Sequence, residues 1–251
     1  MIPLNPCAEI TKKCDKVLII SHREVEQIIN KHMNHKFEMV WDKLAQDRTF
    51  ESISTSSNND PILFWKSGER TAQFLLDLLP SDFPHNATAL DFGVGIGRIA
   101  RPMTQLFSLV IGVDVSKKML EKLRQETTLE GHSKIVSFHI DEPWEHQPVD
   151  FVYSVLTFQH MPDKEVQIAL KRLHKTTKNL AYFQFDTRPR LTRQLTRLLP
   201  LKWISWKWQP GMQRIARKAP IVREWITEAG FEIINEFQPN TELHGFLVQQ
   251  N

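Results

Sequence analysis

Cysteine is scarce in this chain of 251 residues, which has only Cys7 and Cys14. Two thiols are too few for the disulfide framework of a small secreted domain, and their spacing lacks the short pairs of a structural zinc site. His32 and His35 lie three residues apart, but no third ligand follows nearby, so no metal site is expected. The two cysteines are interpreted as free thiols.

Long apolar runs are missing as well. No stretch approaches the roughly 20 apolar residues that cross a bilayer as a helix. The first residues, "MIPLNPCAEITKKCDKVLII", carry Lys12, Lys13, Asp15 and Lys16 where a secretory signal has its apolar segment. The expected location is therefore the cytoplasm. With 41% hydrophobic residues, the chain is long enough to bury the core of one α/β domain.

Acidic residues are absent between Thr187 and Arg223. This segment holds ten of the 32 basic residues, so the net charge of +3 is distributed unevenly along the chain. Ten positive charges without an acid among them should repel one another unless an anionic partner lies against them. The segment therefore stands out as a candidate contact surface.

The N-terminal part is expected to form a helical extension over residues 1–62. Ser21 and Glu24 have the spacing of a capping box, and apolar residues recur at helical intervals up to about Gln46. The stretch "ESISTSSNNDP", residues 51–61, is rich in Ser and Asn and is interpreted as a linker or ordered loop.

From there the pattern predicts a helix that begins near Ser67 and ends at Pro80, followed by alternating strands and helices. The expected strands are 87–92, 109–113, 135–140, 149–155 and 180–185. The expected helices are 98–107, 116–125, 163–174 and 221–229, and two strand-like runs, "FEIINEF" and "HGFLVQ", close the chain. Such alternation favours a parallel sheet with helices on both faces and ligands at the carboxyl ends of the strands.

The stretch "ALDFGVGIGRIA", residues 89–100, places three glycines directly after the first of these strands. A dinucleotide site would need G-x-G-x-x-G, but Arg98 stands where its third glycine should be. A tight turn without any ligand is the structural alternative. Asp114 ends the next strand, 17 residues beyond Gly97, where an acid can accept hydrogen bonds from both ribose hydroxyls. The loop therefore indicates a nucleoside ligand.

These motifs together resemble those of class I S-adenosylmethionine-dependent methyltransferases of the bacterial small-molecule type. "ALDFGVGIGRIA" is similar to their first motif, "VIGVDVSKKMLEKLR" to the acidic second-strand motif, and "VDFVYSVLTFQHMP" to the fourth-strand motif. "FWKSGERTAQFLLDLLP" and "REWITEAGFEII" extend the resemblance to roughly residues 37–249. It implies a doubly wound, mostly parallel seven-stranded sheet with an antiparallel last strand, in a domain of residues 63–251.

The resemblance also implies a set of residues around S-adenosylmethionine. Asp91 would orient the glycine loop, Asp114 would bind the ribose, and Asp141 would meet the adenine amino group. Trp65 and Gly68 match a W-x-x-G that often lies over the methionine end; a plain core aromatic is the alternative for Trp65. The expected cofactor-binding residues are Trp65, Gly68, Asp91, Gly93, Gly95, Gly97, Asp114, Val115, Asp141 and Ser154.

His160 follows the fourth strand in "FQHMP" and is the expected catalytic residue. A base is needed only if the acceptor must lose a proton, and a histidine at this position could remove it. The alternative role is structural, in which His160 holds its loop by hydrogen bonding.

The basic segment is expected to form a cap, residues 187–220, inserted after the fifth strand. One helical face carries Leu191, Leu195, Leu198 and Leu199, another carries Arg190, Arg193 and Arg197, and Trp203, Trp206 and Trp208 follow. This combination suits an anionic or amphiphilic acceptor, or peripheral contact with an anionic membrane, more than nucleic acid. A lid helix that completes the core is the alternative.

The sequence thus predicts methyl transfer to an oxygen or nitrogen of a small, anionic or lipid-like acceptor. A non-catalytic cofactor-binding or membrane-docking protein is the first alternative, and a nicotinamide-dependent oxidoreductase is the second.

Overall fold

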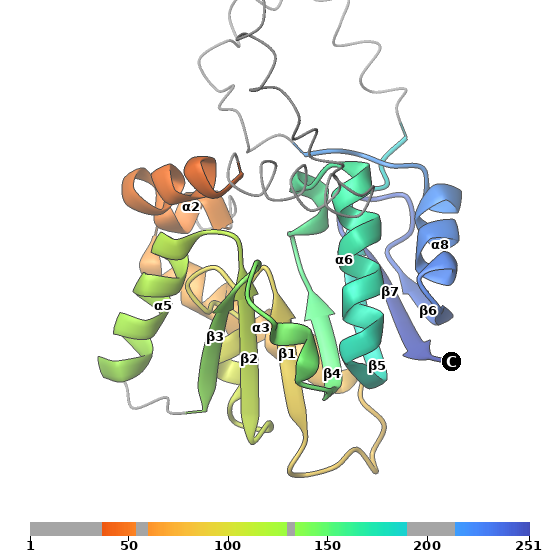
Figure 1. The fold of residues 1–251 in the computed structure, drawn as a ribbon, viewed down its shortest axis with the longest axis horizontal. Helices are drawn as coiled ribbons and strands as arrows, with labels where there is room; N and C mark the ends of the chain where they lie inside the picture. The colour runs from red at the N-terminus through yellow and green to blue at the C-terminus, as the bar shows by residue number, and fades with distance from the viewer. Residues whose placement is uncertain (1–36, 54–59, 130–133, 190–213) are drawn as a thin grey trace, which may run out of the picture.

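The computed structural model describes residues 37–53, 60–129, 134–189 and 214–251. These residues form a seven-stranded sheet with helices packed on both faces (Figure 1). The strands are β1 (Thr88–Phe92), β2 (Leu109–Asp114), β3 (Ile135–His139), β4 (Val149–Ser154), β5 (Thr177–Phe185), β6 (Phe231–Phe237) and β7 (His244–Gln250).

The strand order is β3-β2-β1-β4-β5-β7-β6. The first five strands of the chain are paired in parallel, whereas β7 runs antiparallel to both β5 and β6. The predicted fold class is therefore confirmed. The order reverses between β1 and β4, which creates a crevice at the carboxyl ends of these two strands.

Successive residues of each strand contribute to two separate cores. On one face, Ala89 and Tyr153 pack against α3 (Pro61–Asp77), α4 (Ala100–Met103) and α5 (Lys117–Leu129). On the other face, Leu90 and Val152 pack against α6 (Asp163–Thr176) and α8 (Ala219–Glu228). Because side chains alternate along a strand and both faces are covered, the central strands are apolar almost throughout.

Helix α3 begins at Pro61, so the prediction that it begins near Ser67 was wrong. Asp60 caps it, and its Oδ1 accepts hydrogen bonds from the backbone N–H groups of Ile62 and Leu63 at 2.7 and 3.2 Å. An aspartate followed by proline at the first helical position is itself a helix-start signal, since the missing N–H of Pro61 needs no partner there.

The predicted linker at residues 51–61 was wrong at its start, because α2 (Thr49–Ile53) continues into it. The helix predicted at residues 98–107 is also shorter, since α4 spans only Ala100–Met103. Beyond Met103 the N–H groups of Gln105 and Leu106 bond three residues back, which marks separate turns rather than continued α-helix.

Residues 37–47 are helical, in agreement with the predicted helix end near Gln46. This segment, called the 37–47 helix below, lies with α2 over the carboxyl ends of the strands (Figure 1). Asp42 accepts a hydrogen bond from the Ser116 hydroxyl at 2.6 Å, and Lys122 donates to the Ala45 carbonyl at 2.6 Å. The N-terminal extension therefore packs directly on the sheet edge where a ligand is expected. The predicted capping box lies outside the described residues.

Acids from other parts of the chain pair with four of the five described basic residues of the segment. Arg188 and Arg214 both pair with Glu242, at 3.3 and 2.7 Å. The pairs Arg217–Asp163 and Arg223–Glu236 measure 2.9 and 2.6 Å. The expectation of mutual repulsion is therefore wrong for these four arginines. The leucine, arginine and tryptophan pattern of the expected cap lies outside the described residues.

No helix in the described ranges combines the length and the apolar character that a bilayer span requires.

Candidate functional site

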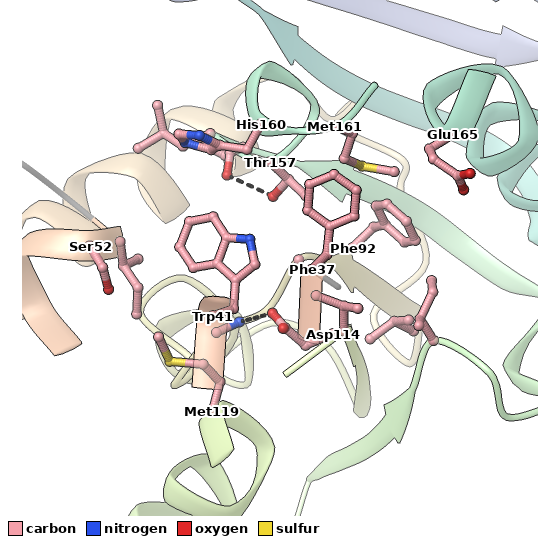
Figure 2. Close-up of a pocket in the computed structure, with 18 of the residues that line it drawn as sticks. Phe37, Trp41, Ser52, Phe92, Asp114, Met119, Thr157, His160, Met161 and Glu165 are labelled. Atoms are coloured by element: carbon pink, nitrogen blue, oxygen red, sulfur yellow. Dashed lines mark hydrogen bonds between the residues drawn. The ribbon is translucent and has the colours of Figure 1, made fainter. Parts of the chain in front are cut away.

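A pocket lies at the carboxyl ends of β1, β2 and β4, beneath the 37–47 helix (Figure 2). Gly93 and Gly95 line it from the loop after β1, Asp114 and Val115 from the end of β2. The segment after β4 closes it through Thr157 and η3 (Phe158–His160). The remaining lining is mostly apolar and comes from Phe37, Trp41, Ile53, Phe92, Val113, Met119, Ile140, Val155, Leu156, Met161 and Pro162. A flat, apolar part of a ligand can therefore lie between the glycine loop and the aromatic side chains of Phe37 and Trp41.

The glycine loop holds a conformation that side chains would prevent. Gly93, Gly95 and Gly97 all have positive φ, at 86°, 55° and 86°. A Cβ at Gly93 would lie 2.1 Å from the Thr157 hydroxyl, so only glycine lets the loop approach η3 this closely. The N–H groups of Gly93 and Val94 both donate to the Val113 carbonyl, at 2.7 and 3.1 Å. The loop is thus tied to the end of β2, directly beside Asp114.

Asp114 is the polar centre of the pocket. Its Oδ2 accepts the N–H of Gly95 at 2.8 Å, and its Oδ1 accepts the N–H of Ser116 at 2.8 Å. An ionised carboxylate has about four lone-pair positions, so Asp114 can still accept hydrogen bonds from a ligand hydroxyl. Burial raises the pKa of Asp114, while hydrogen bonds from Ser116 and Gly95 act in the opposite direction.

Asp91 lies behind the loop rather than in the pocket wall. Its side chain is buried on β1, and burial raises its pKa to about 8, against the opposing influence of Arg98 and of the nearby Tyr153 hydroxyl. The Tyr153 hydroxyl is itself buried without a hydrogen bond of regular geometry among the described residues. Burial thus favours the protonated, neutral form of Asp91, which lies with the buried Arg98 beside the glycine loop.

The 37–47 helix forms the roof of the pocket through two aromatic side chains. Figure 2 shows Trp41 and Phe37 pointing into the cavity, and the Trp41 ring meets the His160 ring edge-on at 5.3 Å. Glu38 anchors the same helix to Lys117 with an ion pair of 2.7 Å. The helix therefore bridges the β2 side and the β4 side of the crevice.

His160 faces the pocket next to Trp41. Its Nε2 lies 3.2 Å from the amide nitrogen of Gln159, which also donates to the Leu156 carbonyl at 3.3 Å. Because an amide nitrogen only donates, this assignment makes Nε2 the acceptor. Glu165, at the other end of the pocket, has a pKa raised by burial. The site thus contains two groups that could exchange a proton with a ligand.

Five of the eleven residues predicted for the site line this pocket: Gly93, Gly95, Asp114, Val115 and His160. The other six lie outside its lining: Trp65, Gly68, Asp91, Gly97, Asp141 and Ser154.

The six outer residues hold the elements around the pocket in place. The guanidinium of Arg101 stacks 3.9 Å from the Trp65 ring centroid, and a Cβ at Gly68 would lie 2.0 Å from the Arg98 carbonyl oxygen. The buried Ser154 hydroxyl donates to the Phe92 carbonyl at 2.9 Å and joins β4 to β1.

Gly97 and Asp141 flank the pocket on the α5 and β3 sides. A Cβ at Gly97 would lie 2.5 Å from a methyl of Leu123, so this glycine lets α5 pack against the loop. The Asp141 carboxylate lies 3.7 Å from Nδ1 of His139, whose Nε2 contacts the Val115 carbonyl at 2.9 Å. Asp141 therefore acts on the pocket wall through His139.

Sequence reasoning missed the contributions of the N-terminal helices. Phe37, Trp41, Ser52 and Ile53 line the pocket but belong to the segment interpreted as an extension and a linker. The available signal was Trp41, a large aromatic three residues before Leu44 and therefore on the same face of the predicted helix. Such a side chain needs a partner surface, and here that surface is the ligand crevice.

Comparison with known proteins shows a family match in the same region. Residues 90–185, which include the glycine loop, Asp114 and His160, match the family model described as a methyltransferase domain. An uncharacterized methyltransferase of Oceanobacillus iheyensis is 30% identical over 86 residues, which are 34% of this chain and 39% of that protein. Phosphoethanolamine N-methyltransferase 3 of Arabidopsis thaliana is 29% identical over 104 residues, covering 39% of this chain and 21% of that protein. The matched regions thus span well under half of these relatives.

Solved structures share the fold over most of the chain. Magnesium protoporphyrin IX methyltransferase from Synechocystis, with bound SAH (S-adenosylhomocysteine), superimposes with a TM-score of 0.61 and 16% identity, covering 90% of this chain and 100% of that one. A methyltransferase of Haloferax volcanii, in complex with the Trm112 activator, gives a TM-score of 0.58 and 16% identity, with 84% and 96% coverage.

Proposed function

We propose that the chain carries a methyltransferase domain of the class I family and transfers a methyl group from S-adenosylmethionine to a small acceptor. The pocket under the 37–47 helix is the proposed cofactor site. The acceptor is proposed to be small or amphiphilic and to be methylated on oxygen or nitrogen.

The observation that carries the proposal is the position of Asp114 beside the glycine loop. Its carboxylate can still accept hydrogen bonds after accepting the N–H groups of Gly95 and Ser116. The two hydroxyls of a ribose fit this remaining capacity. The apolar side chains of Met119 and Ile140 suit an adenine ring, and the positive φ of Gly93 and Gly95 leaves room for the methionine part.

The chemistry requires little more from the protein than positioning. The sulfonium of S-adenosylmethionine activates its methyl group, so transfer is an in-line displacement. Correct orientation of donor and acceptor can contribute about 7–11 kcal/mol to such a step. Trp41 and Phe37 cover the crevice and would exclude water from it. His160, and Glu165 as a second candidate, can accept a proton if the acceptor must lose one.

The nicotinamide alternative has less support. The third glycine of a dinucleotide motif lets the helix after the loop pack closely on the strand. Here Arg98 occupies that position, and its Nη1 donates to the hydroxyls of Ser67 and Thr71 on α3 at 3.2 and 3.4 Å.

Turnover of S-adenosylmethionine in the presence of fractionated metabolite and lipid extracts tests the proposal. Formation of SAH should depend on one or more fractions and should be lost in Asp114→Ala. The proposed activity would be contradicted if folded protein formed no more SAH with any fraction than it forms without an added acceptor. Phosphoethanolamine is a rational first single compound because one relative is named for it.

A further inference from the structure

A second cavity adjoins the proposed cofactor pocket on the α3 side of the sheet. It has a volume of about 360 Å³, within the range of roughly 300–1,000 Å³ typical of small-molecule sites. Its walls come from α3, from Tyr182 and Gln184 on β5, and from the turn between β6 and β7. The ring of Phe74 packs edge-on against that of Tyr182 at 5.6 Å and forms its apolar floor.

The two cavities share one wall at the end of β4. Val155 and Leu156 line both of them. Leu156 has φ +61°, a left-handed conformation that leucine rarely adopts, and its N–H donates to Oε1 of Gln184 at 3.2 Å. This fixed turn therefore forms the wall between the two cavities.

Three arginines line the second cavity: Arg70, Arg98 and Arg214. The acid among its described lining residues is Glu242, which already pairs with Arg214 at 2.7 Å and with Arg188 at 3.3 Å. Among the described residues, no carboxylate forms an ion pair with Arg70. The cavity therefore has an excess of positive charge, which favours an anionic occupant.

Arg98 is the most buried of the three, with 5% of its surface exposed. Its Nη1 donates to the hydroxyls of Ser67 and Thr71, which also line the cavity, but its Nε has no hydrogen-bond partner among the described residues. Burial lowers the pKa of Arg98 to about 10, with Asp91 acting in the opposite direction. A buried N–H donor without an acceptor is costly, and an anion in the cavity would supply one.

We infer that this cavity binds a phosphate or carboxylate group of the methyl acceptor, held by Arg70, Arg98 and Arg214 and facing the cofactor across Val155 and Leu156. Arginine suits this role because its fixed fork of donors matches both kinds of oxyanion. The assignment of the anion to the acceptor rests on the proposed function; the anion site itself does not.

The test uses the full chain and two probes, inorganic phosphate and acetate, titrated at constant ionic strength. Binding is followed through the backbone amide signals of Leu156 and Gln184 and the Nε–H signal of Arg98 in nitrogen-15 NMR spectra. The variants are Arg70→Gln and Arg214→Gln. Lys66→Gln is the matched control, because it removes the same charge from the exposed face of α3 outside the cavity.

At least one probe should shift these signals, and its affinity should fall about fivefold or more in both arginine variants but not in Lys66→Gln. Which of the two probes binds then shows whether the cavity accepts phosphate, carboxylate or both. Absence of binding by both probes, or equal weakening in Lys66→Gln, would overturn the inference. SAH affinity, measured on the same samples, separates the two proposals: protein that binds SAH but neither probe contradicts only the anion site, whereas protein that binds a probe but not SAH contradicts only the proposed function.

Discussion

Replacing Asp114 by Asn changes one acceptor atom at the centre of the pocket. Both carboxylate oxygens accept a backbone N–H, from Gly95 and Ser116, each at 2.8 Å. The amide of Asn offers one acceptor oxygen and one donor nitrogen, so one of these N–H groups must face another donor. A bound ribose also loses an acceptor. Leaving such groups unpaired costs about 1–3 kcal/mol, which corresponds to roughly 5- to 150-fold weaker binding.

Asp150→Asn provides the matched control. Asp150 lies at the amino end of β4, and its Oδ2 alone accepts both the N–H and the hydroxyl of Thr88, at 2.8 and 3.0 Å. An Asn carbonyl can take over both bonds, so the affinity for SAH should stay at the wild-type value.

Isothermal titration calorimetry with SAH, together with thermal denaturation of each variant, measures both effects. The unfolding midpoint of Asp114→Asn should also fall, by about 2–4 °C for each kcal/mol lost in a chain of this size. A folded Asp114→Asn protein that binds SAH within about twofold of the wild type would refute the assigned role. Equal weakening by Asp150→Asn would refute it as well.

Three further changes test separate parts of the site. The pKa of Asp91 is raised by burial to about 8, so the native state binds its proton more tightly than the unfolded chain. Wild type should therefore lose stability relative to Asp91→Asn as the pH rises from about 4 to about 8. Unfolding midpoints of the two proteins that change equally with pH would contradict this. Gly93→Ala places a Cβ 2.1 Å from the Thr157 hydroxyl at a φ of 86°. The resulting strain of about 1–3 kcal/mol should displace the loop and weaken SAH binding. An unchanged SAH affinity in calorimetry would argue against this contact. His160→Ala should lower kcat at least about tenfold, with cofactor affinity retained and one inflection lost from the pH–rate profile, whereas equal losses of stability and activity would assign His160 to holding the loop.

Much of the fold was predictable because strand and helix patterns alternate locally along the chain. The short apolar runs were enough to predict the strands of the sheet. Gly93 and Asp114 each follow or end a parallel strand, which places both residues at the same edge of the sheet. The start of α3 was also readable from Asp60 and Pro61, but the polar stretch before them favoured a loop interpretation.

The roof of the pocket was not predictable in the same way. Trp41 approaches His160 only after the 37–47 helix has docked through Asp42 and Ser116, which are 74 residues apart in the chain. The ion pairs of Arg217 and Arg223 likewise depend on acids brought in from α6 and β6. Local patterns carry no information about such contacts, because tertiary packing decides them.

Direct calorimetric titration of the purified chain with S-adenosylmethionine, SAH and NAD tests the central claim most directly. The glycine loop and Asp114 predict that the first two bind with micromolar affinity, on the order of −8 kcal/mol, and that NAD gives no detectable heat. Binding of NAD without binding of S-adenosylmethionine or SAH would contradict the account.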